Sequence, residues 1–276
     1  MVRAAYSAGK PAYGVGPGNV PAFIERTADV PKAVENILKS KTFDNGTICA
    51  SEQAVVIDRP VKEQVIAEFR RRGAYFLDPS AVKQLESVMF LPTGGLNPGI
   101  VGRPATVIAR MAGLSVPEGT RVLAVELEGV GKAYPLSAEK LSPVLAFYTV
   151  DGWEEGCHRC IQLLQYGGIG HTLVIHSRDE SIIREFALKK PVFRILVNTP
   201  TSQGAIGLTT GLAPSLTLGC GTWGGNATSD NVTPLHLINI KRLAYGLDET
   251  PTGGEEISEA DIGRIVAEVL HRLKVG

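Results

Sequence analysis

The sequence predicts an α/β fold in which helices cover a sheet in layers. Short apolar runs rich in β-branched residues alternate along the chain with segments whose apolar residues recur at helical spacing. This alternation is typical of layered α/β domains. The chain has 276 residues, which is enough for one large core and a smaller appendage. No apolar run approaches the ~20 residues of a membrane span, so we expect no membrane partner.

The elements follow in order from capping and periodicity. Asp29 is a favourable N-cap, and Pro31 lies in the first turn of a helix that ends at Asp44-Asn45-Gly46. Later elements continue the alternation of helix and strand. We expect helices at 61–72, 79–90, 104–112, 152–165 and 180–188, strands at 54–57, 121–127, 171–176 and 193–198, an apolar segment at 142–149 and a Gly/Pro loop at 91–102.

The C-terminal part changes character. Residues 199–231 are rich in Gly, Thr and Ser, and residues 235–244 alternate apolar with polar in part, like a strand covered on one side. Residues 247–256 form a polar Pro/Gly linker. Ser258 and Asp261 then precede apolar residues at helical spacing, which predicts an amphipathic tail helix.

Charge and cysteine content exclude several classes of protein. The 28 basic and 28 acidic side chains give a formal net charge of zero, so nothing predicts a nucleic-acid partner. The N-terminus lacks the apolar core of a signal peptide. Four cysteines are too few for a disulfide framework at this length, and reduced thiols suit the cytosol. We therefore expect a cytoplasmic protein.

Cys49 lies on the connection between the first helix and the strand that follows it. A loop containing Gly46 can hold a thiol clear of both elements, as a covalent nucleophile requires. The alternative is that Cys49 is a small buried hydrophobe, as many free cysteines are.

Two other motifs are interpreted as structural. Cys157 and Cys160 fall on one face of a predicted helix, and no second ligand pair follows at zinc-site spacing, so we expect core positions and no metal. The Gly-x-Gly-x-Gly pattern within residues 12–19 lacks the strand and helix that would make it a phosphate loop.

Four segments in order along the chain carry a resemblance to a known family. They are residues 43–53, 96–102, 139–145 and 218–225. Together they resemble the CoA-acylating branch of the aldehyde dehydrogenase superfamily, which includes acetaldehyde and propionaldehyde dehydrogenases and the aldehyde half of bifunctional aldehyde-alcohol dehydrogenases. The resemblance implies a three-layer α/β catalytic domain over 1–215, a Gly-rich return segment and oligomerisation strand over 216–246, and a linker and tail helix over 247–276.

The resemblance also implies an N-terminal difference. Similar enzymes carry roughly 200 further residues before the point that matches Met1, and these form most of the dinucleotide-binding domain. We therefore expect this chain to lack most of that half and, on its own, to bind NAD weakly and to be inactive.

The implied chemistry is covalent. The resemblance makes Cys49 the nucleophile that attacks a short-chain aldehyde, with NAD as hydride acceptor and CoA as acyl acceptor. Hydrolytic relatives carry a glutamate roughly 35 residues before the cysteine, where it activates water. The matching residues 12–19 contain no carboxylate, and the first acid is Glu25, which favours CoA over water. A hydrolytic aldehyde dehydrogenase and a non-catalytic fragment or assembly subunit are the alternatives.

The same resemblance suggests the rest of the site. His171 follows a glycine-rich turn at the start of a strand and is the candidate acid/base, with a structural histidine as the alternative. Glu139 resembles the glutamate that binds the ribose of the cofactor, and Leu141 and Pro143 belong to the same cofactor-binding segment. A solvated loop glutamate is the alternative for Glu139.

Partners also follow by resemblance. A strand near 235–244 joins a neighbouring subunit's sheet in similar enzymes, so we expect a homo-oligomer; an edge strand within the chain is the alternative. The tail helix resembles the peptides that deliver enzymes to bacterial microcompartments, with a shell protein as the partner. A helix that packs back on its own domain is the alternative.

Overall fold

The computed structural model describes residues 2–247 and, in the C-terminal tail, residues 258, 260, 262–264, 266–267 and 271. The chain divides into two compact units, Met1–Leu237 and Ile238–Gly276. The first unit is built on a seven-stranded sheet with the strand order β3-β4-β5-β2-β1-β6-β7. Each neighbouring pair in this sheet is parallel.

The strands are β1 (Val20–Ile24), β2 (Glu52–Asp58), β3 (Ala74–Phe76), β4 (Val122–Glu126), β5 (Val144–Val150), β6 (Gly170–His176) and β7 (Val192–Val197). The α-helices are α1 (Val2–Ser7), α2 (Val30–Thr42), α3 (Lys62–Arg71), α4 (Pro79–Met89), α5 (Ala105–Met111), α6 (Gly152–Gly167), α7 (Glu180–Leu188) and α8 (Thr201–Ala205).

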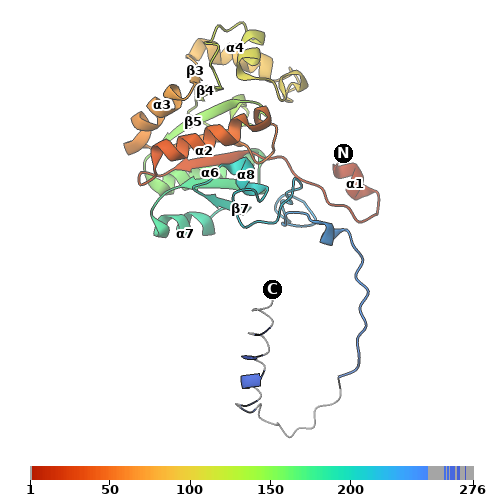
Figure 1. Cartoon of the computed structure of the whole chain (residues 1–276). Coiled ribbons are helices and arrows are strands. Elements are labelled where there is room, and N and C mark those ends of the chain that lie inside the picture. The colour runs from red at the N-terminus through yellow and green to blue at the C-terminus, as the bar shows by residue number, and fades with distance from the viewer. Residues whose placement is uncertain are drawn as a thin grey trace. The chain divides into compact units, whose positions relative to one another are not determined.

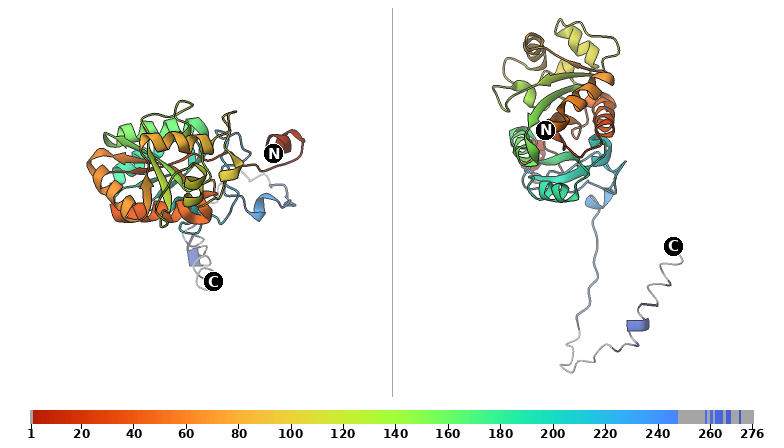
Figure 2. Two further views of the ribbon diagram at one scale, coloured as in Figure 1. Left: turned by 90° about the horizontal axis from the view of Figure 1, so that it is seen from above. Right: turned by 90° about the vertical axis from the view of Figure 1, so that its left-hand side faces the viewer.

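The helices form a layer on each face of the sheet. In β1, Ala22 and Ile24 pack with residues of α2, α3 and α8, whereas Phe23 points to the other face and packs with α4 to α7. This alternation follows from the period of two along a strand. Figure 2 shows the sheet between the red α2 and the green α6, and Figure 1 shows α2 across one face of the sheet. The three-layer α/β prediction is therefore confirmed.

Most predicted elements are present with boundaries shifted by a few residues. Asp29 caps α2 and accepts a hydrogen bond from the Lys32 N–H at 3.2 Å. The sequence interpretation missed β1, β3, α1 and α8. The stretch 235–244 begins in the short 3₁₀ helix Pro234–His236 and pairs with no strand among the described residues of this single chain, so a strand shared with a neighbouring subunit stays a prediction.

The tail is described only in part. Residues 260, 262–264, 266–267 and 271 are helical. Ser258 is described. Asp261, Ile265, Val269, Leu270 and Leu273, on which the prediction of an amphipathic helix also rests, lie outside the described residues, as do residues 248–256 of the linker. Among the helices that the structure describes, none has the length and apolar character needed to cross a membrane.

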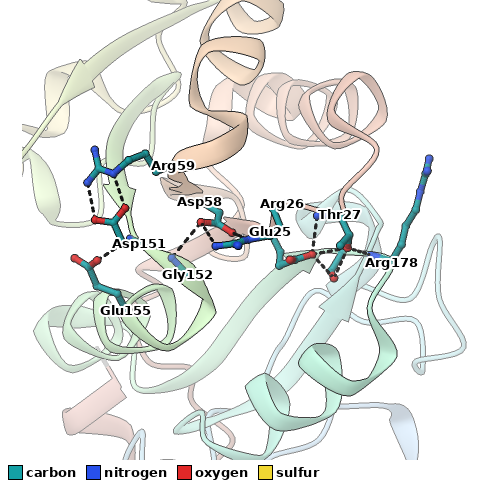
Figure 3. A network of polar contacts seen from close by, with 10 residues as sticks. Glu25, Arg26, Thr27, Asp58, Arg59, Asp151, Gly152, Glu155 and Arg178 are labelled. Atoms are coloured by element: carbon teal, nitrogen blue, oxygen red, sulfur yellow. Dashed lines mark hydrogen bonds and ion pairs between the residues drawn. The ribbon is translucent and has the colours of Figure 1, made fainter.

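Ion pairs and hydrogen bonds close the carboxyl edge of the sheet (Figure 3). Asp58, at the end of β2, accepts hydrogen bonds from Arg26 Nε at 2.6 Å and from the Gly152 N–H at 3.1 Å. Glu25, directly after β1, accepts from Ser177 Oγ at 2.8 Å. Open parallel sheets usually bind ligands at their carboxyl edge. Here that edge is occupied by the protein's own charged side chains.

Candidate active site

The candidate site residues gather at the opposite, amino edge of the sheet. Cys49 precedes β2, Glu139 precedes β5, and His171 is the second residue of β6. In a parallel sheet the amino ends of all strands lie at one edge. The topology therefore brings together residues that are far apart in the sequence.

A sharp turn presents Cys49. Helix α2 ends at Thr42, and the following turn holds Asp44 at φ 47°, Asn45 at φ 49° and Gly46 at φ 76°. Two non-glycine residues in the left-handed region store backbone strain, which is common at functional sites. The Ser51 N–H donates to the Ile48 carbonyl at 2.8 Å and closes the turn around the half-buried Cys49.

Gly18 is the point at which the three site segments meet. Its N–H donates to Glu139 Oε1 at 3.1 Å. A Cβ atom at Gly18 would lie 1.9 Å from the Cys49 carbonyl oxygen and 3.5 Å from His171 Cδ2. Only glycine can fill this position without displacing the thiol-bearing turn.

Glu139 is a carboxyl group with a strongly perturbed pKa. Burial raises its pKa to about 7, and its hydrogen bond from Gly18 and the charge of the buried Lys41 oppose that rise. Gln53 Oε1 accepts hydrogen bonds from the Lys140 N–H at 3.0 Å and from Lys41 Nζ at 3.3 Å. The side chain of Gln53 thereby ties the Glu139 segment to the strand that follows Cys49.

His171 is buried and neutral at physiological pH. Its Nδ1 lies 2.9 Å from Thr172 Oγ1, and its Nε2 has no hydrogen-bond partner among the described residues. Burial, followed by the charge of Arg194, lowers the pKa of His171 to about 3. A neutral imidazole with a free nitrogen can accept a proton from a neighbouring acid.

The thiol of Cys49 is protonated at neutral pH. Burial, together with the charges of Glu139 and Cys220, raises its pKa to about 11, and a hydrogen bond from its own backbone N–H opposes that rise. No carbonyl among the described residues accepts this N–H. It therefore remains available as a donor beside the sulfur atom.

The remaining predicted residues have mixed environments. Leu141 adopts φ 44° and its carbonyl accepts the Gly102 N–H at 3.1 Å. Pro143 is buried and its carbonyl accepts the Leu123 N–H at 3.0 Å, which is a contact of the sheet. Cys157 and Cys160 lie in the hydrophobic core, as predicted.

Sequence reasoning missed Gly18 and Lys41 as parts of the site. The glycine pattern of residues 12–19 was noticed and interpreted only as a weak phosphate-loop motif. The apolar run that follows Gly18 is the signal that could have identified it as the amino end of a strand. Lys41 lies on a helix where a lysine is usually solvated, so nothing in the sequence indicated that it is buried.

Comparisons with known proteins identify relatives of the chain. No protein-family model matches the chain. The bifunctional aldehyde-alcohol dehydrogenase of Escherichia coli is 49% identical over 249 residues, which are 88% of this chain and 28% of the relative. The crystal structure of an acetylating aldehyde dehydrogenase from Geobacillus thermoglucosidasius is 53% identical with a TM-score of 0.88, and the match covers 91% of this chain and 55% of that one.

A more distant structure has ligands. The propionaldehyde dehydrogenase of Rhodopseudomonas palustris was solved with bound CoA and an acylated cysteine; it is 26% identical with a TM-score of 0.74, over 83% of this chain and 51% of that one. These similarities place the chain in the aldehyde dehydrogenase superfamily. Within it, the chain is similar to enzymes that are named as acetylating. It spans between about a quarter and about half of the length of these relatives.

Proposed function

We propose that this chain carries the covalent centre of a CoA-acylating aldehyde dehydrogenase, which interconverts a short-chain aldehyde and its acyl-CoA with NAD. The observation that carries the proposal is the meeting of Cys49, Glu139 and His171 at Gly18. The acylated cysteine of the Rhodopseudomonas palustris relative supports the same role for Cys49.

In the forward direction, Cys49 Sγ forms a bond to the aldehyde carbonyl carbon while the carbonyl π electrons move to oxygen. A pKa of about 11 leaves on the order of 10⁻⁴ of the thiol ionised at pH 7. The thiol proton must therefore be removed as the sulfur attacks. His171 is the proposed acceptor because its imidazole is neutral and its Nε2 has no partner among the described residues, and the Cys49 N–H is the proposed donor to the developing oxyanion.

Glu139 fits a role in holding the cofactor. Its Oε1 accepts the Gly18 N–H, and no described residue uses its Oε2. A free carboxylate oxygen beside the thiol can accept a hydrogen bond from a ribose hydroxyl. Leu141 and Pro143 would shape the same segment. NAD held there would supply a hydride acceptor, and the acyl group would stay on Cys49 as a thioester.

The acyl group then passes to CoA. The CoA sulfur bonds to the acyl carbon, the bond to Cys49 Sγ breaks, and the CoA thiol proton returns to the Cys49 thiol. The carboxylate Glu25, the first in the chain, lies at the carboxyl edge of the sheet, remote from the amino edge where Cys49 lies.

A specific observation favours hydrolysis as the second candidate. Glu139 is near Cys49, and its pKa of about 7 suits a general base.

Partners and location belong to the same proposal. Large apolar side chains are exposed in residues 235–247, which supports pairing with a second copy of the chain. These are Leu235, Leu237, Ile238, Ile240, Leu243, Tyr245 and Leu247. We propose a homo-oligomer in the cytoplasm, with the tail helix as a docking segment for a microcompartment shell protein.

The half-reaction with CoA can be tested on this chain because it needs no NAD. Incubation with acetyl-CoA should release CoA and add one acetyl group to Cys49, as intact mass and peptide mapping would measure. The matched control, Cys157→Ser, should acetylate normally, whereas Cys49→Ser should not. A folded chain that never acetylates at Cys49 would refute the proposal. An acetyl-enzyme that water removes as fast as CoA does would favour the hydrolytic candidate.

A further inference from the structure

Two buried side chains that the proposed mechanism does not use are in direct contact on the face of the sheet covered by α6 and α7. Lys190, in the turn between α7 and β7, donates from Nζ to Cys157 Sγ on α6 at 2.5 Å. Lys190 is 3% exposed and Cys157 is 5% exposed. The contact is shorter than an ordinary N–H···O hydrogen bond of about 2.9 Å, although sulfur is larger than oxygen. The amine and the thiol therefore face each other with no atom between them.

Lys190 has no carboxylate partner among the described residues. Besides the thiol, its Nζ donates to the Phe186 carbonyl at 3.3 Å, and it lies 3.4 Å from the centre of the Phe186 ring. The adjacent Lys189 is exposed and pairs with Glu185 at 3.0 Å. A buried lysine normally has an acid as its partner, because an unpaired ammonium is costly to take out of water. At Lys190 the thiol of Cys157 takes the place of that acid.

The surroundings favour reaction at Cys157 over the second thiol one turn further along α6. Cys160 is fully buried, and burial raises its pKa to about 12, so it stays a protonated thiol at neutral pH. Burial also lowers the pKa of Lys190, and Cys160 and Cys157 oppose that fall. A lysine with a lowered pKa is more often the free amine, which is its nucleophilic form. The contact therefore places a nucleophilic nitrogen against a sulfur atom.

We propose that Cys157 and Lys190 form an oxidation site at which a hydroperoxide links the two side chains covalently. Hydrogen peroxide transfers one oxygen atom to Cys157 Sγ: the O–O bond breaks, an S–O bond forms, and the products are the sulfenic acid and water. Lys190 Nζ then bonds to the sulfur while the S–O bond breaks, and the hydroxyl leaves as a second water with one proton from the amine. Sulfur loses two electrons and the peroxide gains two.

The product is a sulfenamide that joins α6 to the turn before β7. Sulfenic acids condense with a neighbouring thiol or nitrogen, and the nitrogen of Lys190 is the group in contact with Cys157. Cβ atoms three residues apart on a helix are about 5–6 Å apart, whereas a disulfide needs about 3.5–4.5 Å, so Cys160 is the less favourable partner. The oxidation site does not include Cys49 and stands apart from the proposed function.

The test is treatment of the folded chain with hydrogen peroxide, followed by intact mass and by peptide mapping without reductant. The cross-link should lower the mass by ~2 Da and join the peptide of Cys157 to that of Lys190 until dithiothreitol separates them. Lys190→Arg keeps the charge but offers no free amine, so the yield of joined peptide should fall at least ~10-fold. The matched control Lys189→Met and the variant Cys160→Ser should both cross-link like the parent.

Equal yields of joined peptide in Lys190→Arg and the parent would overturn the proposal. A disulfide between Cys157 and Cys160, or oxidation of Cys157 to its acids with no joined peptide, would overturn it as well. If Lys190→Arg does not fold, the parent can be oxidised in urea, which separates the two side chains. The joined peptide should then be lost, and the same yield in urea and in water would refute a site built by the fold.

Discussion

Replacing Gly18 with alanine should destabilise the chain and disable Cys49 together. The added methyl would lie 1.9 Å from the Cys49 carbonyl oxygen and 3.0 Å from the Cys49 carbonyl carbon. Carbon and oxygen atoms come into contact at about 3.3 Å. The turn that carries the thiol must therefore retreat by ~1 Å or more, or Gly18 must move and weaken its hydrogen bond to Glu139.

The free-energy cost of crowding at Gly18 can be isolated by comparing Gly18→Ala with Gly119→Ala. A Cβ at Gly119 would meet nothing within 4 Å, and neither glycine has a left-handed φ. Both substitutions gain ~0.4–1 kcal/mol from the reduced entropy of the unfolded chain. This gain cancels in the comparison, so the difference between the two variants measures the crowding, which we expect to be ~1–3 kcal/mol.

The measurements are urea unfolding followed by circular dichroism and acetyl transfer from acetyl-CoA to Cys49. Gly119→Ala should be neutral or slightly stabilising with normal acetylation. Gly18→Ala should be less stable, and its acetylation should fall by up to ~10²-fold, the cost of displacing a reacting group by about 1 Å. If the two variants unfold at the same urea concentration and acetylate equally, Gly18 is not the junction of the site.

Two further predictions concern stability. Burial lowers the pKa of His176 from 6.5 to about 4. Between these two pH values the folded state binds fewer protons than the unfolded state, so the free energy of unfolding falls as the pH falls from about 6.5 to about 4. The loss is ~1.4 kcal/mol per pH unit, which amounts to ~2 kcal/mol at pH 5. The buried His171, whose pKa is lowered to about 3, contributes a slope of the same sign. His176→Leu should therefore reduce the total slope by the His176 share in urea titrations at several pH values, and the exposed His158→Leu should not; equal slopes in the two variants would contradict the assignment. Gly46 has φ +76°, and a Cβ there would lie 2.9 Å from the Ser142 carbonyl oxygen, whereas Gly113 has φ +71° and a Cβ there would meet nothing within 4 Å. Gly46→Ala should therefore cost ~1–3 kcal/mol more stability than Gly113→Ala. Equal melting temperatures of the two variants would argue against a crowded turn.

The sequence predicted the layered architecture because most strands and helices have clear periodicity and caps. It missed β1, an interior strand between β2 and β6, because Pro21 argues against an interior strand. The structure accommodates the proline through a shift of register between Val20 and Pro21 against β2. It missed β3 because three residues at the sheet edge are too few to show a pattern.

The candidate site was less predictable than the fold. Cys49, Glu139 and His171 were chosen by resemblance and by local motifs, and only the parallel topology brings their segments to one edge. Nothing local to Gly18 indicated that it lies against the Cys49 carbonyl. A charged residue in a strand normally faces water, so the burial of Arg194 under residues 219–231 could not be anticipated from β7 itself.

The reactivity of the thiol follows from this convergence and from no single motif. Burial, Glu139 and Cys220 hold the proton on Cys49, while the backbone N–H of Cys49 and the charge of Arg194 favour its release. These opposing groups come from four segments that are distant in the sequence. Protonation of Glu139 would remove one obstacle to ionisation of the Cys49 thiol, whereas removing Arg194 would add one. The Cys49 thiol is therefore expected to stay mostly protonated while Glu139 carries its charge.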